Sequence, residues 1–199
     1  MKKLINSLVF VSIILIGTNS FSYNSDPKIF IDELLKEIME TLIDKNVSKT
    51  DKRKKIEIIA LENIDVKALG MYTLGNARKT LDQSTLKKYT ELFEKYFLKN
   101  LTSRLDDYSK NKFEVISADQ KSEIYTIVKS KITESSSQPE IIINWRVYTK
   151  DPDKPLVRDL VVEGLSLAKT QKEEFASILN SNNNDINFLF SKLEEFINN

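Results

Sequence analysis

The sequence lacks cysteine and histidine altogether, and these two absences exclude most of the chemistry that a small enzyme uses. Without cysteine there is no thiolate nucleophile, no disulfide and no zinc site built on sulfur. Without histidine there is no imidazole general base and no histidine-ligated haem. Glycine is scarce too, and the four glycines match neither of the common phosphate-binding spacings. The sequence therefore argues against thiol chemistry, against metal sites built on cysteine or histidine, and against the usual nucleotide-binding loops.

A strong net charge is also absent. The formal charge is +1 over 199 residues, and removal of Lys2 and Lys3 by processing would change it to −1. Such a small charge gives no electrostatic reason to expect nucleic acid as a partner. With 41% hydrophobic residues, the chain suits one globular domain with a sizeable core and room for a small helical subdomain. We interpret the scattered lysines as a solvated face, with headgroup or partner contact as the alternative.

The first 22 residues have the three parts of a secretory signal peptide. Two lysines precede an apolar run from Leu4 to Gly17, and Ser20-Phe21-Ser22 has the small side chains of a cleavage site. The run is too short for an ordinary membrane-spanning helix, and an uncleaved anchor is the alternative. We therefore expect residues 1–22 to be removed on export and the mature domain to span residues 23–199. Core packing alone must stabilise an exported domain without disulfides.

A cap and a proline open the first predicted helix. Asp26-Pro27 supplies both, and apolar residues then recur at helical spacing as far as Ile43. A polar loop is expected at residues 47–53, followed by two short helices at residues 54–61 and 66–74. These segments predict a helical N-terminal region.

The longest predicted helix runs from about Gln83 to Tyr108, and Asp82 or Thr80 can cap it. It carries a wide apolar stripe rich in phenylalanine and tyrosine, while lysine and glutamate occupy much of the opposite side. A stripe of this width needs a large apolar surface to cover it. We therefore expect the long helix to lie on a sheet.

Four strands are predicted after the long helix. Residues 113–118 and 122–133 alternate like strands around a turn at residues 119–121. Residues 141–147 and the stretch 156–167 form a second hairpin with apolar residues on both faces. Both faces must therefore be covered, and helices can cover one while the other lines a cavity.

Two predicted helices end the chain, one from Lys169 and one capped by Asp185 after an asparagine loop. The expected fold class is α+β, with an antiparallel sheet of four or more strands. The long helix and the helical N-terminal and C-terminal segments pack this sheet. An apolar lipid pocket is expected between sheet and helices.

Three motifs and the long aromatic-rich helix occur in a characteristic order. The motifs are Leu74-Gly75, Asn144-Trp145-Arg146 and the string from Asp159 to Leu167. This order resembles the MlaC family, also called toluene-tolerance auxiliary proteins, and the likeness covers roughly residues 26–196. The string looks like the family's strand of D, three apolar or small residues and E-G-V-S-L. The chain departs from the family at Asn76-Ala77-Arg78, where the family usually has an aromatic residue.

Members of that family are periplasmic carriers that take phospholipid between an inner-membrane ABC transporter complex, with its MCE-domain subunit, and an outer-membrane lipoprotein. The resemblance implies a periplasmic carrier that maintains outer-membrane lipid asymmetry, with phospholipid as cargo and with no cofactor, metal or catalytic residue. The physics agrees with this function. At about 0.8 kcal/mol per methylene, two acyl chains represent more than about 20 kcal/mol of apolar burial, so lipid needs help to cross water.

The resemblance also implies which side chains line the lipid pocket. We expect apolar residues from both helices and strands: Leu69, Leu74, Phe93, Phe97, Leu101, Val128, Ile143, Trp145, Val161 and Leu165. Leu165 is preferred because its string matches the family's pocket-facing strand. A stripe at this spacing is more often part of an ordinary core, and Trp145 could equally fill the other face of the sheet.

Two other classes of function stay open. A periplasmic chaperone or peptide-binding module would use the same apolar cradle, and a small acid–base hydrolase would use carboxylates alone. Asp159 and Glu163 lie four residues and about 13 Å apart along one predicted strand, too far apart for the paired carboxylates of a glycosidase. We therefore expect a binding protein and not an enzyme.

Overall fold

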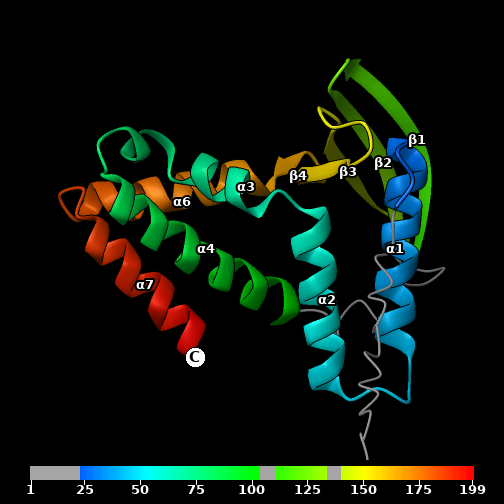
Figure 1. Cartoon of the computed structure of the whole chain (residues 1–199), viewed down its shortest axis with the longest axis horizontal. Helices are drawn as coiled ribbons and strands as arrows, with labels where there is room; N and C mark the ends of the chain where they lie inside the picture. Colours follow the sequence, from blue (N-terminus) through cyan, green and yellow to red (C-terminus); the bar gives the residue numbers. More distant parts are fainter. Residues whose placement is uncertain (1–22, 104–110, 134–139) are drawn as a thin grey trace, which may run out of the picture.

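The computed structural model describes residues 23–103, 111–133 and 140–199. The predicted signal peptide and the predicted end of the long helix near Tyr108 lie outside these ranges. Six α-helices and one five-stranded antiparallel sheet form the described part of the chain (Figure 1). The predicted α+β class and the antiparallel sheet of at least four strands are confirmed.

Two helices open the described chain, α1 (Pro27–Ile43) and α2 (Lys49–Asn63). As predicted, the Asp26 side chain caps α1, because it accepts hydrogen bonds from the backbone N–H groups of the first turn. The loop predicted at residues 47–53 is wrong, since Ser48 caps α2 and the helix begins at Lys49. The first turns of α2 are exposed and therefore polar, since the buried residues of this helix begin at Ile56. A polar stretch can thus be helical, and polarity alone does not indicate a loop.

Three further helical segments follow: α3 (Val66–Thr73), a 3-10 turn η1 (Gly75–Lys79) and α4 (Gln83–Ser103). Asp82 opens α4 as predicted, because its carboxylate accepts a hydrogen bond of 2.8 Å from the backbone N–H of Thr85. Gly75 has a φ of +60°, a conformation that favours glycine, and it separates α3 from the region before α4.

The sheet is a meander in which neighbouring strands are consecutive in the sequence. Its strands are β1 (Lys112–Ser122), β2 (Tyr125–Thr133), β3 (Ile141–Tyr148), β4 (Leu156–Val162) and β5 (Leu165–Ser166). The turn predicted at residues 119–121 is wrong, because Asp119 and Gln120 pair with Ile127 and Thr126. The hairpin therefore turns at residues 123–124, and β1 is longer than predicted.

The second hairpin strand also ends earlier than predicted. Its continuation to Leu167 is wrong, since Glu163 and Gly164 adopt φ values of +48° and +84° and reverse the chain after Val162. The short β5 then pairs back on β4. It leads directly into α6 (Leu167–Ser181), which α7 (Ile186–Asn198) follows after a cap at Asp185.

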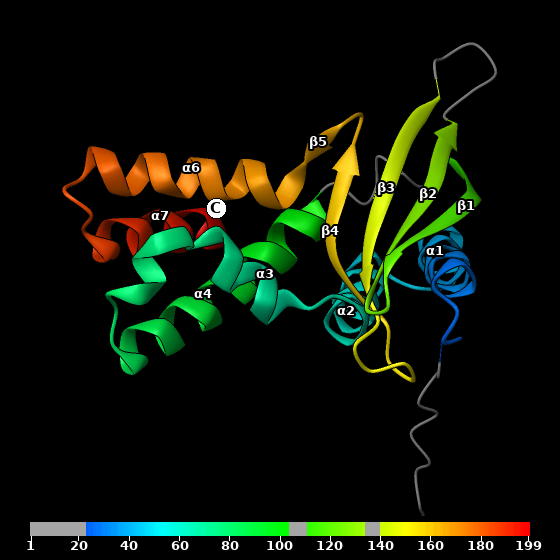
Figure 2. The same ribbon diagram turned by 90° about the horizontal axis from the view of Figure 1, so that it is seen from above.

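The sheet with α1 and α2 forms one part of the molecule, here called the sheet lobe (Figures 1 and 2). Helix α1 packs on β1 and β2, and α2 packs on α1. The buried core of this lobe is mainly aliphatic: Phe30, Ile31, Leu34, Leu35, Ile59, Val128, Ile132, Ile143, Trp145, Val147 and Val157.

Helices α3, α4, α6 and α7 form the helical lobe, which extends to one side of the sheet (Figure 2). Its buried core is Val66, Leu74, Tyr89, Phe93, Phe175, Leu179, Leu189, Phe190 and Leu193. Helix α4 packs mainly on α3 and α7 and meets α2 at its C-terminal end. Its position therefore differs from the expected one on the sheet: the stripe is covered, but by other helices.

Candidate functional site

The two lobes meet along β4. Three consecutive residues of this strand, Val157, Arg158 and Asp159, contact the two segments that lead into the helical lobe, one at the start of α3 and one at the start of α6. On the side of α3, Ile64 forms a parallel bridge with Val157, and the backbone N–H of Asp65 donates to the Val157 carbonyl at 2.9 Å. The Ile64 side chain packs against both the sheet-lobe core and the helical-lobe core. This short segment therefore fixes the point at which α2 leaves one lobe and α3 enters the other.

Arg158 adds a polar link at the same place. Its guanidinium donates two hydrogen bonds to one carboxylate oxygen of Asp65, at 2.9 Å and 2.7 Å. The same guanidinium lies 3.5 Å from the centre of the Tyr148 ring. Contacts of this kind orient the guanidinium and tie α3 to β3 and β4, although partial exposure limits their strength.

Asp159 holds the second connection, to α6. It is only 8% exposed, and its carboxylate accepts hydrogen bonds from Ser166 Oγ at 2.6 Å and from the backbone N–H of Ala168 at 2.9 Å. Arg146 forms an ion pair with it at 3.1 Å. Ser166 in turn caps α6 by accepting from the Lys169 N–H. Asp159 therefore positions the start of α6 against the sheet.

Glu163, the second acidic residue of the string from Asp159 to Leu167, bonds to other partners than Asp159 does. Its carboxylate accepts a hydrogen bond from the backbone N–H of Ile142 on β3, and its backbone begins the turn to β5. The string thus contains a buried carboxylate that holds α6 and a turn that starts β5. In this chain the string joins the sheet to the helical lobe.

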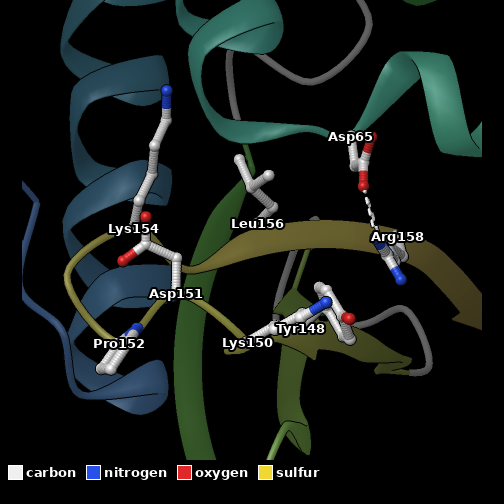
Figure 3. Close-up of a pocket in the computed structure, with 8 residues that line it drawn as sticks. All are labelled: Asp65, Tyr148, Lys150, Asp151, Pro152, Lys154, Leu156 and Arg158. Atoms are coloured by element: carbon white, nitrogen blue, oxygen red, sulfur yellow. Dashed lines mark hydrogen bonds and ion pairs between the residues drawn. The ribbon is translucent and has the colours of Figure 1, made fainter.

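A pocket of about 450 Å³ lies beside this junction (Figure 3). Its lining residues come from β3, β4, their connecting loop and the start of α3: Asp65, Tyr148, Lys150, Asp151, Pro152, Lys154, Leu156 and Arg158. The volume falls within the range of about 300–1,000 Å³ that is usual for small-molecule sites. Five of the eight lining residues are charged, and Tyr148, Pro152 and Leu156 add apolar surface.

A second pocket of about 340 Å³ lies between the start of α3 and the middle of α4. It is lined by Val66, Lys67, Thr90, Glu91, Glu94 and Lys95. Charged residues again dominate. Neither of these two pockets corresponds to the apolar pocket that the sequence predicted between sheet and helices.

The ten residues predicted to line a lipid pocket do not converge on one place. Leu69, Leu74, Phe93 and Phe97 pack in the helical lobe, while Val128, Ile143 and Trp145 pack in the sheet lobe. Leu101, near the end of α4, packs on a small separate cluster of Leu42 and Ile56. Val161 is half-buried on β4, and Leu165 is 69% exposed.

Trp145 and Leu165 differ most in their surroundings. The Trp145 side chain is buried in the core that includes α1, and its Nε1 donates to Ser130 Oγ at 2.8 Å. Leu165 follows the Glu163-Gly164 turn, so its expected place on the long second strand is wrong. Its contact with lipid stays a prediction. In this structure the Leu165 side chain is exposed and does not pack in either apolar core.

Sequence reasoning missed the junction residues Asp65, Arg158 and Tyr148. Asp65 and Arg158 are 93 positions apart, and no local periodicity reports a contact between them. Asp65 begins a segment that resembles the family's aspartate-to-"LG" segment, and this was the one available signal. The functional interpretation depends on apolar residues and assigns no role to these three.

The buried hydroxyl groups of the helical lobe have structural partners. Burial raises the pKa of Tyr89, whose hydroxyl shares a hydrogen bond of 2.9 Å with Thr73. Burial also raises the pKa of Tyr96, which donates to Gln171 Oε1 at 2.8 Å. Both tyrosines therefore stay neutral at physiological pH and link α4 to α3 and α6.

Within the described ranges, no three side chains of His, Cys, Asp or Glu are grouped to hold a metal ion. None of the helices in this part of the chain combines the length and apolar character needed to cross a bilayer. The described part of the chain is thus an α+β protein in which an antiparallel meander joins a helical lobe, each with its own apolar core.

The chain belongs to the MlaC family, since the family model described as MlaC protein matches residues 30–195. A phospholipid-binding protein from Ralstonia solanacearum, solved in complex with a phospholipid, has the same fold with a TM-score of 0.70. The two share 15% sequence identity, and the alignment covers 87% of this chain and 97% of that chain. A search of curated proteins found no match.

Proposed function

We propose that this protein is a periplasmic carrier of glycerophospholipid. It takes lipid between an outer-membrane lipoprotein complex and an inner-membrane ABC transporter with its MCE-domain subunit, and so maintains outer-membrane lipid asymmetry. The observation that carries the proposal is the MlaC match over residues 30–195. The phospholipid bound to the structural neighbour supports the same cargo.

The place where the lobes meet is the best candidate for the acyl chains. Each lobe has its own buried core, and the contact of Leu101 with Leu42 and Ile56 forms a third, small cluster between them. An acyl chain can enter between the lobes without taking either core apart. Insertion there would recover much of the roughly 0.8 kcal/mol per methylene that exposure to water costs.

Exposure divides the predicted pocket residues into two groups. Leu69, Phe97, Leu101 and Val161 are half-buried and Leu165 is exposed, so lipid can reach them after a small movement. The other five are fully buried and could contact lipid only if a core rearranged: Leu74, Phe93, Val128, Ile143 and Trp145. Close-packed cores resist such rearrangement. We therefore assign the first group to the lipid site and the second to the cores.

Native mass spectrometry of the protein purified from the periplasm tests the proposal. We expect mass additions that match diacyl phospholipids, and transfer of labelled phospholipid from one vesicle population to another when the protein is added. Co-purified polypeptide without lipid would favour the chaperone or peptide-binding alternative. Turnover of a model ester or glycoside without bound lipid would favour the hydrolase.

A pair of variants tests the site. Leu101→Glu places a carboxylate at the contact between lobes and should lower lipid occupancy, because an unpaired charge is costly where water is scarce. Leu61→Glu introduces the same charge at a leucine of α2 that is 42% exposed, and should leave occupancy unchanged. Circular dichroism of both variants checks that they fold. Equal occupancy in both would place the lipid elsewhere.

The start of the mature chain is part of the same proposal. We infer cleavage after Ser22, so that Tyr23 becomes the first residue. Tyr23 supports this boundary, because its ring packs edge-on against Phe30 at 5.7 Å and its hydroxyl bonds to Glu37. N-terminal sequencing of the exported protein tests it, and an intact N-terminus in the membrane fraction would favour the uncleaved anchor.

A further inference from the structure

The connection between α1 and α2 concentrates positive charge far beyond the average of the chain. Residues 44–55 contain six basic and two acidic residues, a local net charge of +4, whereas the whole chain has +1. The remaining residues therefore carry a net −3. This segment, here called the basic hairpin, lies at one end of the molecule, at the bottom of Figure 1.

Three charges of the basic hairpin are available to a partner. Arg53, Lys54 and Lys55 are exposed, and within the part of the chain that the structure describes they form no ion pair. One of the two acidic residues, Asp51, is engaged in the cap of α2 through Ser48.

Packing of the two helices gives these charges a fixed position. Helix α2 buries Ile56, Ile59 and Asn63 on one side, so Arg53, Lys54 and Lys55 project around the rest of its circumference. Lys52 donates to the Leu42 carbonyl at 2.6 Å and ties the start of α2 to the end of α1. The charges therefore surround the start of α2 and give this end of the molecule a positive potential.

Two apolar side chains accompany the charges. Ile43, the last residue of α1, is 58% exposed, and Val47 in the connecting turn is 37% exposed. Basic side chains next to exposed apolar side chains are the combination that binds the headgroup region of anionic bilayers, with charge for attraction and apolar groups for shallow insertion. An acidic protein surface would use the charges but would give the two apolar side chains no comparable partner.

We infer that the basic hairpin docks the protein on the surface of a bilayer that contains anionic phospholipid. The inference rests on the proposed function in one respect: a lipid carrier must approach a membrane to load or release cargo. Helix α2 runs from the hairpin to the junction between the lobes, so docking through the hairpin would fix the orientation of the junction about one helix length, roughly 22 Å, from the surface (Figure 1). The salt dependence of the docking should be strong, since exposed charges are screened.

Sedimentation with lipid vesicles tests the inference on the exported protein. We expect binding to phosphatidylcholine vesicles that contain about a third phosphatidylglycerol, weak binding to pure phosphatidylcholine, and release by added salt. The triple variant Arg53→Gln, Lys54→Gln, Lys55→Gln should bind anionic vesicles about tenfold more weakly or worse. The double variant Ile43→Ser, Val47→Ser should lower the part of the binding that survives salt.

A matched triple variant controls for total charge. Lys67→Gln, Lys87→Gln, Lys95→Gln removes three exposed lysines from the helical lobe and should leave vesicle binding unchanged. Equal loss in both triple variants, or equal binding to neutral and anionic vesicles, overturns the inference. So does capture of an acidic protein by the hairpin without vesicle binding.

Native mass spectrometry of the same samples separates this inference from the proposed function. Retained phospholipid cargo without binding to anionic vesicles would refute the docking surface and leave the carrier intact. Vesicle binding without cargo would refute the carrier and leave the surface intact. Trp145 fluorescence confirms that each variant keeps the packed sheet lobe, since this is the single tryptophan of the chain.

Discussion

The two lobes of the molecule are built from the chain in different ways. The strands of the sheet lobe follow one another in sequence order, and each pairs with its neighbour. The helical lobe combines residues 66–103 with residues 167–198, and the whole sheet intervenes between them. The sheet-lobe core is largely aliphatic, whereas four of the nine buried residues of the helical-lobe core are aromatic, and Phe93 contacts Tyr89 and Phe175 there.

This difference shows what local sequence patterns report. A hairpin places partners next to each other in the sequence, so a strand pattern nearly determines what the strand pairs with. A helical stripe reports only that something covers it. Tyr96 of α4 bonds to Gln171 of α6, 75 positions away, and nothing in the spacing of either helix identifies the other.

The largest expected effect concerns the ring at the centre of the helical lobe. Phe93 is 2% exposed, and it touches Tyr89, Tyr96, Phe97 and Phe175. Phe93→Ala should lower the free energy of unfolding by about 3–5 kcal/mol, because it leaves a cavity in a close-packed core. Urea denaturation followed by circular dichroism measures the loss.

The same variant tests whether the lobes unfold together. Trp145 fluorescence reports the sheet lobe, and we expect its transition to coincide with that of circular dichroism, since Ile64 packs on both cores. Phe188→Ala is the control, because this phenylalanine of α7 is 40% exposed and should contribute little. A fluorescence transition that stays at the wild-type midpoint while the helices unfold would mean that the lobes are independent.

The second prediction compares the two acidic residues of one string. Asp159→Ala should cost about 2–3 kcal/mol, because it leaves the Ala168 N–H and the Arg146 guanidinium without their carboxylate and weakens the start of α6. Glu163→Ala should cost less than about 1 kcal/mol, since its carboxylate lies on the exposed side of the turn. Thermal unfolding of both variants makes the comparison. Equal losses would show that Asp159 does not hold the two lobes together.

Much of the fold could be predicted because its signals are local. The caps at Asp26, Asp82 and Asp185 were read from residue type, and the hairpin around β3 and β4 from its period of two. The early start of α2 was missed because its first turns are almost entirely polar. The end of β4 was missed because Glu163, a residue that rarely adopts a positive φ, does so here beside Gly164.

The candidate site was less predictable, for a different physical reason. A pocket is the space that side chains leave unfilled, and a sequence pattern does not report such space. Apolar side chains at strand or helix spacing give the same pattern whether they pack against protein or against lipid. Phe93 and Phe97 lie one turn apart on the same stripe, yet one is fully buried and the other is half-buried. The positions of α3, α6 and α7 decide how deeply each ring is buried. These positions depend on contacts between residues far apart in the sequence.

The third prediction concerns Leu165. This residue lies in β5, between the last long strand of the sheet lobe and α6 of the helical lobe, and belongs to neither core. The Leu165 side chain is 69% exposed, so Leu165→Glu should change the free energy of unfolding by no more than about 0.5 kcal/mol. Denaturation measures this, and native mass spectrometry of the same variant measures bound phospholipid. Unchanged stability with reduced cargo would support the lipid contact expected from the family's string. Unchanged stability with unchanged cargo would remove Leu165 from the site, and a large loss of stability would contradict its exposure.

The smallest expected effect concerns the cap that starts the long helix of the helical lobe. Hydrogen bonds from the Ser84 hydroxyl and then from the Thr85 N–H lower the pKa of Asp82 below its ordinary value of 3.8. A lowered folded pKa means that the ionised carboxylate stabilises the fold above the ordinary value, and that this contribution disappears as the pH falls through the folded pKa. Asp82→Asn keeps a capping oxygen but cannot titrate, so its stability should depend less on pH below about 4 than that of the wild type. Thermal unfolding between about pH 2 and pH 7 measures the two slopes, and Asp82→Ala, which lacks any capping oxygen, should be less stable than the wild type at neutral pH. Identical slopes for the wild type and Asp82→Asn would show that other carboxylates, on either lobe, account for the acid sensitivity of the fold.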